Sequence, residues 1–260
     1  MLEVQEGSAR SVPDRGREES MRSWLEPFSP EFSSVIEKGL AGCGKNQRKV
    51  AVFDADGTLW DGDIGEAFLR WLIAARKLRN VDYYQDIYAE YEAMVEVDRV
   101  RAYAHACQLM AGLPLPEVQD WSAEYAYSWP NYRPAMRDLA LGLRSVGVET
   151  WIVSASNHWT VNEAGPRAGI PRDCCLGIRT EVVDQVLTDR LVLPVTCSQG
   201  KVDAIRKHIC AKPLFAFGDS MGDFEMLCLA RNGLVVQQHG HLRSELLRHA
   251  DEREWPVHVF

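Results

Sequence analysis

The sequence lacks the features that define membrane-spanning, secreted and nucleic-acid-binding proteins. Its 260 residues contain no apolar run of membrane-spanning length, and no cationic segment followed by a hydrophobic one opens the chain. The formal net charge is −8 and the basic residues are scattered, so nucleic acid and anionic membrane surfaces are poor partners. With 46% hydrophobic residues the composition is that of an ordinary globular protein, and we expect it in the cytoplasm.

The cysteines show no pattern typical of a disulfide framework or a zinc site. There are seven, an odd number, without a CxxC spacing and with one adjacent pair, Cys174 and Cys175. This usage favours free thiols in a reducing compartment.

The chain alternates between strand-like and helix-like segments after a polar start. Residues 1–20 are charged and without periodicity, and we expect them to be disordered. Short apolar runs typical of buried strands are followed by amphipathic segments, which predicts an α/β fold with a parallel sheet and right-handed crossovers. The predicted strands are 50–53, 150–153, 214–217 and 234–236, and the predicted helices include 133–146 and 201–210.

One block, residues 61–132, has helical periodicity only. We expect it to form an all-helical cap on an α/β core made of residues 21–60 and 133–260. One helical face would contain Ile64, Phe68, Trp71, Leu72 and Ala75, and another Tyr84, Tyr88 and Tyr91. All eight tyrosines fall in this block; packing between helices is favoured over a cage for a quaternary ammonium group. A second insertion, 177–194, alternates like a hairpin with its turn near Asp184 and Gln185.

Polar side chains follow each predicted strand. Two carboxylates, Asp54 and Asp56, come directly after the first strand, although neighbouring carboxylates oppose each other's ionisation unless they share a cation or a proton. Because ligands of open α/β sheets bind beyond the carboxyl ends of the strands, polar groups from later segments should converge there. These groups are Thr58, Ser154, Lys201, Asp219 and Asp223.

This set of side chains suits phosphoryl transfer. Carboxylate oxygens are preferred ligands of Mg²⁺, a lysine and Mg²⁺ together neutralise a phosphoryl group, and a serine hydroxyl can donate to its oxygens. One aspartate could then attack phosphorus while its neighbour handles the leaving-group proton.

The segments "DADGTLW", "VSAS", "GK" and "GDSMGD" resemble, in this order, the four motifs of the haloacid dehalogenase-like hydrolase superfamily. Within it they are similar to the phosphoserine-phosphatase-like branch, and the resemblance extends from Val50 to Val236. It implies a Rossmann-like core with a helical cap inserted between the first and second motifs. The sequence "SAS" at 154–156 departs from the glycines usual in phosphoserine phosphatases, which puts phosphoserine itself in question.

The resemblance also implies roles for individual residues. Asp54 would be the nucleophile that forms an aspartyl-phosphate, and Asp56 the general acid and base. Asp54, the Asp56 carbonyl and Asp219 would hold Mg²⁺, with Asp223 orienting that shell. The expected phosphate-binding residues are Thr58, Ser154, Ala155 and Lys201.

Four residues are candidates for contacting the rest of the substrate. Asp63 and Glu66 begin the first helix of the block, where they either complement the helix dipole or reach an amine or hydroxyl of the substrate. Asn157 and His158, just after the second motif, could line the pocket mouth.

We therefore expect a Mg²⁺-dependent phosphomonoesterase that acts on a small phosphorylated metabolite resembling phosphoserine or phosphocholine. One alternative is a phosphotransferase with the same site, which product analysis with added acceptor alcohols would identify. Another is a non-catalytic binding protein on this fold, which would fail a chromogenic phosphomonoester assay run with Mg²⁺ and with chelator.

Overall fold

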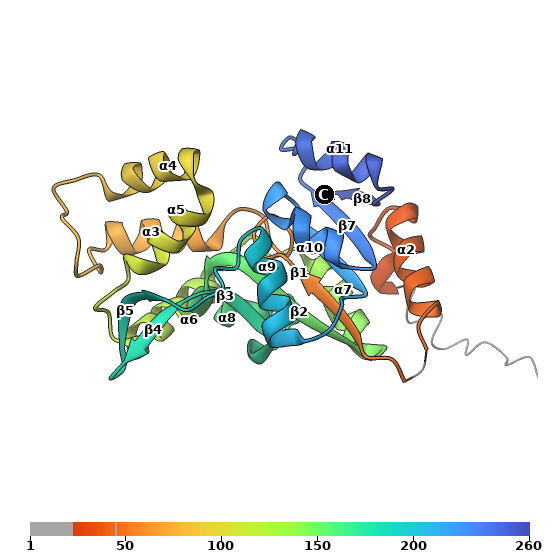
Figure 1. Cartoon of the computed structure of the whole chain (residues 1–260), viewed down its shortest axis with the longest axis horizontal. Coiled ribbons are helices and arrows are strands. Elements are labelled where there is room, and N and C mark those ends of the chain that lie inside the picture. The colour runs from red at the N-terminus through yellow and green to blue at the C-terminus, as the bar shows by residue number, and fades with distance from the viewer. Residues whose placement is uncertain (1–22, 45) are drawn as a thin grey trace, which may run out of the picture.

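The computed structural model describes residues 23–44 and 46–260, and its centre is a parallel sheet (Figure 1). The segment predicted to be disordered, 1–20, lies outside the described residues. The sheet has six strands in the order β3-β2-β1-β6-β7-β8, and every pairing is parallel. The strands are β1 (Lys49–Phe53), β2 (Val148–Asn157), β3 (Cys175–Ile178), β6 (Phe215–Gly218), β7 (Asn232–Gln237) and β8 (Val257–Val259).

Helices cover both faces of this sheet. Alternate residues of β1 point to opposite sides, so that Ala51 and Phe53 join one apolar cluster while Val50 and Val52 join another. The first cluster includes residues of α2 (Pro30–Ala41), α7 (Pro134–Ser145) and α8 (His158–Ala164). The second includes residues of α9 (Gln199–Ala204), α10 (Phe224–Leu229) and α11 (Ser244–Glu252). The predicted α/β fold with a parallel sheet is confirmed.

Short helical turns complete the connections. They are the 3-10 turns η1 (Gly165–Ala168), η2 (Arg172–Cys174) and η4 (Met221–Asp223) and the π-helical turn η3 (Ile205–Ile209). The helix predicted over 201–210 is found as one continuous helical segment, in which α9 ends at Ala204 and widens into the π-helical turn η3.

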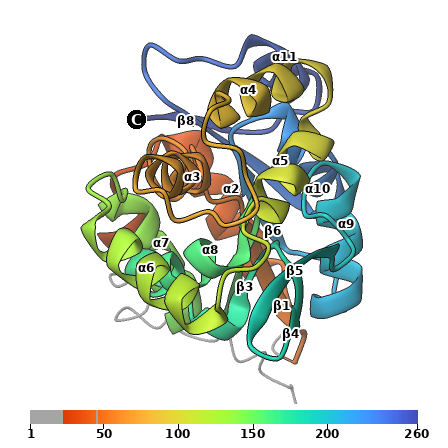
Figure 2. The same cartoon turned by 90° about the vertical axis from the view of Figure 1, so that its left-hand side faces the viewer.

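The segment between β1 and α7 contains four helices. They are α3 (Ile64–Ala74), α4 (Ile87–Val97), α5 (Arg99–Gln108) and α6 (Leu115–Ser128). Figure 2 views the molecule from the side on which α3, α4 and α5 lie. Two details of the predicted helical faces are wrong: Ala75 lies beyond α3 and is exposed, and Tyr84 precedes α4 with a fully exposed side chain. The reason at α4 is that Asp86 caps the helix by accepting a hydrogen bond from the Ala89 amide.

The predicted hairpin is confirmed and joins these helices to the sheet. Strands β4 (Thr180–Val183) and β5 (Val186–Leu191) pair antiparallel, and their two-residue turn has positive φ at Asp184 and Gln185. Leu187 of β5 lies in a third apolar cluster with Phe68 and Leu72 of α3. Helix α6 packs against α8. The division of the chain into domains at residues 61 and 132 stays a prediction.

Two further expectations concern composition. All seven cysteines are free thiols, as their spacing predicted. None of the helices in the described ranges is both long and apolar enough to cross a membrane.

We predict that Phe217→Ala destabilises the protein by about 3–5 kcal/mol. Phe217 is fully buried and its ring stacks on Phe53 at a centroid distance of 4.4 Å, so truncation leaves a cavity under the sheet. Urea unfolding followed by circular dichroism measures the loss. The control Tyr84→Ala alters an exposed ring and should change the free energy of unfolding by less than about 0.5 kcal/mol. Equal effects of the two variants would contradict this account of the core.

Candidate active site

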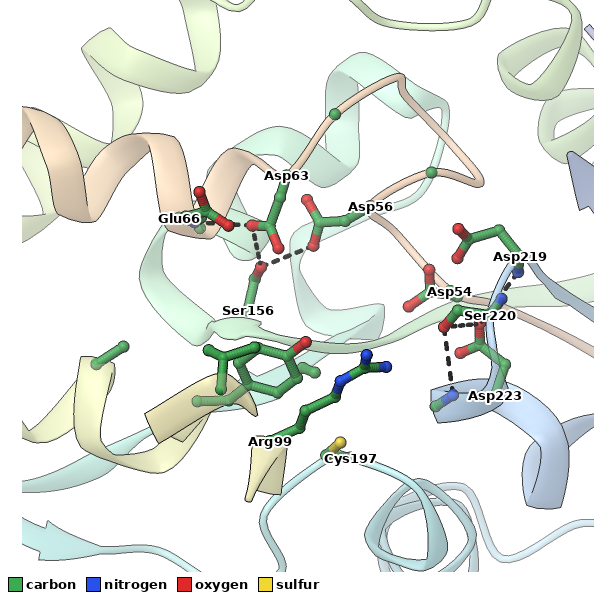
Figure 3. Close-up of a pocket in the computed structure, with 18 of the residues that line it drawn as sticks. Asp54, Asp56, Asp63, Glu66, Arg99, Ser156, Cys197, Asp219, Ser220 and Asp223 are labelled. Atoms are coloured by element: carbon green, nitrogen blue, oxygen red, sulfur yellow. Dashed lines mark hydrogen bonds between the residues drawn. The ribbon is translucent and has the colours of Figure 1, made fainter. Parts of the chain in front are cut away.

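The carboxyl ends of the central strands open into a cavity of about 840 Å³ that is lined by acidic residues (Figure 3). Asp54 follows β1, Asp219 follows β6, and Asp223 ends the turn η4. Carboxylate oxygens of these three residues lie within 4.8 Å of one another, and all three residues are buried. The structure therefore brings together side chains that lie up to 169 positions apart in the chain.

One lysine is inserted among these carboxylates. Lys201, from the first turn of α9, places Nζ 2.5 Å from Oδ1 of Asp54 and 2.6 Å from Oδ1 of Asp223. The other oxygen of Asp223 accepts hydrogen bonds from the amides of Asp219 and Ser220, each at 3.1 Å. Asp223 thereby positions both the lysine and the loop that carries Asp219.

A single lysine does not balance the charge of this cluster. Burial, and next the charge of Asp223, raise the pKa of Asp54 to about 7 despite the opposing effect of Lys201. Burial and the charges of Asp223 and Asp54 raise the pKa of Asp219 well above its usual value. Burial alone would lower the pKa of Lys201, but the carboxylates outweigh burial and raise it. The cluster therefore favours binding of additional positive charge.

The residues present fit a hard divalent cation such as Mg²⁺. The donors are buried carboxylate oxygens at suitable mutual distances, and they carry uncompensated negative charge. Gly57 leaves room for them: it has φ +82°, and a Cβ there would lie 2.4 Å from Oδ2 of Asp219.

Asp56 is turned away from this cluster toward the start of α3 (Figure 3). Its Oδ1 accepts hydrogen bonds from Nε1 of Trp60 at 2.8 Å and from the amide of Ile64 at 2.7 Å. Its Oδ2 accepts one from Oγ of Ser156 at 2.7 Å. Burial raises the pKa of Asp56 although these hydrogen bonds oppose the shift. A half-buried, firmly oriented carboxyl group of this kind suits general acid and base chemistry.

Asp63 lies on the other side of Ser156. It caps α3 by accepting a hydrogen bond from the Glu66 amide at 2.7 Å, and Oγ of Ser156 lies 3.4 Å from its Oδ1. Burial and the charge of Asp56 raise the pKa of Asp63 well above its usual value. The close approach of α3 to β2 depends on Gly65, because a Cβ there would lie 2.3 Å from Oγ of Ser156.

Of the other predicted site residues, some line the cavity and others lie outside it. Glu66, Ala155 and Asn157 line the cavity, although the side-chain oxygen of Asn157 is engaged in capping α8 through the Thr160 amide. Ser154 is fully buried behind the cavity wall, and its hydroxyl donates to Oδ2 of Asp56 at 3.3 Å.

Thr58 and His158 do not line this cavity. The hydroxyl of Thr58 is buried and makes no hydrogen bond to the part of the chain that the structure describes. His158 lines a separate cavity of about 300 Å³ with Arg179 and Thr180. Its predicted place at the pocket mouth is therefore wrong, because α8 begins at this residue and turns its side chain to another face. Burial lowers the pKa of His158 to about 4.

Several residues of the site were not predicted. Ser156 could have been found from the alternation of β2, which places it on the same side as Ser154. The indole of Trp60 donates a hydrogen bond of 2.8 Å to the side chain of Asp56. The side-chain amide of Gln237 donates one of 2.7 Å to the backbone carbonyl of Asp219. Arg99 comes to the cavity from α5, and no sequence pattern marked it.

A parallel α/β sheet with an acidic cluster and a lysine at its carboxyl edge defines a class of proteins suited to metal-assisted phosphoryl chemistry. A family profile described as haloacid dehalogenase-like hydrolase matches residues 51–227. The chain belongs to this family, which confirms the resemblance seen in its motifs.

Curated relatives with phosphatase names are similar over most of the chain. Phosphoserine phosphatase SerB2 of Mycobacterium tuberculosis is 27% identical over 218 residues, which cover 81% of this chain and 49% of the relative. The chain thus spans about half the length of that protein. Phosphoserine phosphatase SerB1 of the same organism is 24% identical, and the aligned region covers 95% of this chain and 86% of the relative. Histidinol-phosphatase of Neisseria meningitidis is 22% identical, and the aligned region covers 81% of this chain and 98% of the relative.

Solved structures show the same fold. A protein of unknown function from Bordetella pertussis superposes with a TM-score of 0.70 at 19% identity, covering 82% of this chain and 98% of its own. A phospho-aspartyl intermediate analogue of phosphoserine phosphatase superposes with a TM-score of 0.54 at 16% identity. The superposed region covers 82% of this chain and 93% of that structure. The Rossmann-like core predicted from the sequence is confirmed.

We predict that the free energy of unfolding of the metal-free protein falls as pH rises from about 4 to 7. Unfolded Asp54 loses its proton near the ordinary value of 3.8, whereas in the folded chain it keeps the proton until about pH 7. The folded state therefore binds more protons in this window, and Asp54 alone lowers the stability by up to about 1.4 kcal/mol per pH unit. Urea unfolding in chelator at pH 5, 6 and 7 measures the slope.

The variant Asp54→Asn should make this slope shallower by the contribution of Asp54, while Asp63 and Asp219, whose pKa values are also raised, keep part of it. The matched control Asp138→Asn alters an exposed aspartate on α7 and should leave the slope as in the parent protein. A slope that Asp54→Asn leaves unchanged would show that this carboxyl group is not the source of the pH dependence.

Proposed function

We propose that this chain is a Mg²⁺-dependent phosphatase that hydrolyses a small phosphomonoester through an aspartyl-phosphate on Asp54. The observation that carries the proposal is the buried cluster of Asp54, Asp219 and Asp223 around Lys201, with the oriented carboxyl group of Asp56 beside it. The phosphatase names of its relatives support the same reaction class.

In the first step a carboxylate oxygen of Asp54 attacks phosphorus and the bond from phosphorus to the leaving oxygen breaks. Asp56 gives its proton to that oxygen, so that the product leaves as a neutral alcohol. Lys201 offsets the charge of Asp54 and of the phosphoryl oxygens. A bound Mg²⁺, held by Asp54, Asp219 and the Asp56 carbonyl, would add positive charge at the same place.

In the second step a water molecule attacks the phosphorus of the aspartyl-phosphate. Asp56, now ionised, takes a proton from this water, the bond from phosphorus to Asp54 breaks, and inorganic phosphate leaves. The hydrogen bonds from Trp60, Ile64 and Ser156 keep the Asp56 carboxylate oriented through both steps. Asp56 thus ends in its starting protonation state.

Phosphate binding is proposed for Lys201, together with the segment of Ser154 and Ala155. Lys201 and Ala155 line the cavity, while Ser154 acts through its hydrogen bond to Asp56. For Thr58 the buried hydroxyl favours a positioning role in the loop after β1, where its amide donates to the Ala55 carbonyl at 3.2 Å.

The helices α3–α6 are proposed to act as a cap that closes over the bound ester and excludes water during phosphoryl transfer. Two of the cavity's carboxylates, Asp63 and Glu66, belong to this segment, and we propose that they face the leaving group of the substrate. A small metabolite of the cytoplasm is the expected substrate class.

We predict that Asp54→Asn abolishes turnover of p-nitrophenyl phosphate in Mg²⁺, because an amide cannot form the aspartyl-phosphate. Chelator should abolish the activity of the parent protein, and added Mg²⁺ should restore it. The assay is the release of nitrophenolate. Retained activity in Asp54→Asn would refute the covalent route.

We predict that Asp56→Asn slows hydrolysis of an alkyl phosphate by about 10²–10⁴-fold. Loss of the nitrophenolate leaving group needs no proton, so the first step with that ester should suffer much less. Because the second step still lacks its base, acid-quenched samples with p-nitrophenyl phosphate should accumulate phosphoprotein. The isosteric control Asp138→Asn should affect neither ester. Equal slowing of both esters in the first step would contradict the proton-donor role.

A further inference from the structure

One buried cation lies outside the wall of the cavity. Arg133, directly before α7, is only 6% exposed and does not line the cavity itself. Its charge is incompletely paired: Nη2 lies 3.7 Å from Oδ1 of the exposed Asp61, and within the described ranges Nε has no hydrogen-bond partner. Burial of such a charge costs stability, and an apolar side chain of similar volume is often as stable in its place. Arg133 is therefore better explained by what it positions than by packing.

The guanidinium group of Arg133 joins the two segments that contact Asp219. Its Nη2 donates a hydrogen bond to the carbonyl of Gly57 at 3.3 Å, and its Nη1 donates one to Oε1 of Gln238 at 2.8 Å. Gly57 lies against the carboxylate of Asp219. Gln237, the neighbour of Gln238, donates to the backbone carbonyl of Asp219. Arg133 thus links the segment that contacts this carboxylate to the segment that holds its backbone.

The same guanidinium group fixes the peptide that follows Asp56. The amide of Gly57 donates a hydrogen bond to the carbonyl of Trp60 at 2.9 Å, and the carbonyl of Gly57 accepts one from Arg133. Glycine can leave a positive φ as easily as it adopts one, so these two hydrogen bonds hold the conformation. In a trans peptide the carbonyl of Asp56 points opposite to the amide of Gly57, and its direction is therefore fixed as well.

We propose that Arg133 is a positioning residue for the cation site. Its two hydrogen bonds hold the loop after β1 and the end of β7 at the separation at which the oxygen atoms of Asp54, Asp219 and the Asp56 carbonyl can bind Mg²⁺ together. The inference rests on the phosphatase function proposed above. Because Arg133 does not line the cavity, its loss should weaken binding of the ion rather than of the ester.

The variant that tests this role is Arg133→Lys. Burial lowers the pKa of Arg133 and the charges of Asp61 and Asp219 oppose that shift, so the charge of the guanidinium group acts on the acidic cluster. Lysine keeps this charge but lacks the planar fork that reaches two acceptors at once, so the variant tests the hydrogen bonds alone.

The measurement is a calorimetric titration of the substrate-free protein with Mg²⁺. Loss of a group that orients metal ligands lowers metal affinity about 10–100-fold, and we expect the Kd of Arg133→Lys for Mg²⁺ to rise by this factor. The Mg²⁺ concentration for half-maximal hydrolysis of p-nitrophenyl phosphate should rise equally, while the KM for the ester at saturating Mg²⁺ stays as in the parent protein. The control Arg137→Lys alters an exposed arginine one turn further along α7 and should leave the Kd unchanged.

A Kd of folded Arg133→Lys equal to that of the parent protein would overturn the proposal and leave Arg133 a role in the fold alone. If this variant does not fold, Gln238→Leu replaces the test, because it removes one acceptor of the guanidinium group and keeps the charge. It should also raise the Kd, and an unchanged Kd would again overturn the proposal. A parent protein that does not bind Mg²⁺ would instead show that the proposed phosphatase function is wrong.

Discussion

The repulsion among buried carboxylates at the carboxyl edge of the sheet is the constraint on which the site depends. Asp54, Asp219 and Asp223 lie within a few ångströms of one another, and Lys201 supplies one positive charge among them. Burial, and next the charge of Asp223, raise the pKa of Asp54, and a bound cation would relieve the repulsion. The arrangement is tolerable because the rigid sheet beneath it, with Phe53 and Phe217 stacked in its core, holds the strand ends in place.

The second carboxylate after β1 has a different environment and so a different role. Asp56 is bound to the start of α3 through the Ile64 amide and to β2 through Ser156, and thus connects the sheet to the helical segment. Any movement of α3 relative to β2 would change the hydrogen bonds of the proposed acid and base. The closing of the proposed cap and the orientation of the proton donor are therefore mechanically coupled.

The central strands β1, β2, β6 and β7 and the hairpin were predictable because their determinants are local, whereas the short outer strands β3 and β8 were missed. Apolar runs ending in carboxylates marked β1 and β6, and the alternation from 177 to 194 marked β4 and β5. The errors fall where local pattern and tertiary context disagree. Tyr84 matched a helical spacing but lies before the cap of α4, and His158 followed the second motif but begins a helix that faces another cavity.

The sequence by itself determined the order of the acidic, hydroxyl and lysine residues along the chain and their places at strand ends, since these follow from periodicity and motif spacing. Only the tertiary structure decided which of them meet. Ser156 reaches the cavity because β2 is long, and Arg99 reaches it because α5 folds back over the sheet edge. Thr58 does not line the cavity because the loop after β1 buries its hydroxyl. Such contacts join positions distant in the chain, and no local pattern of residues encodes a distance in space.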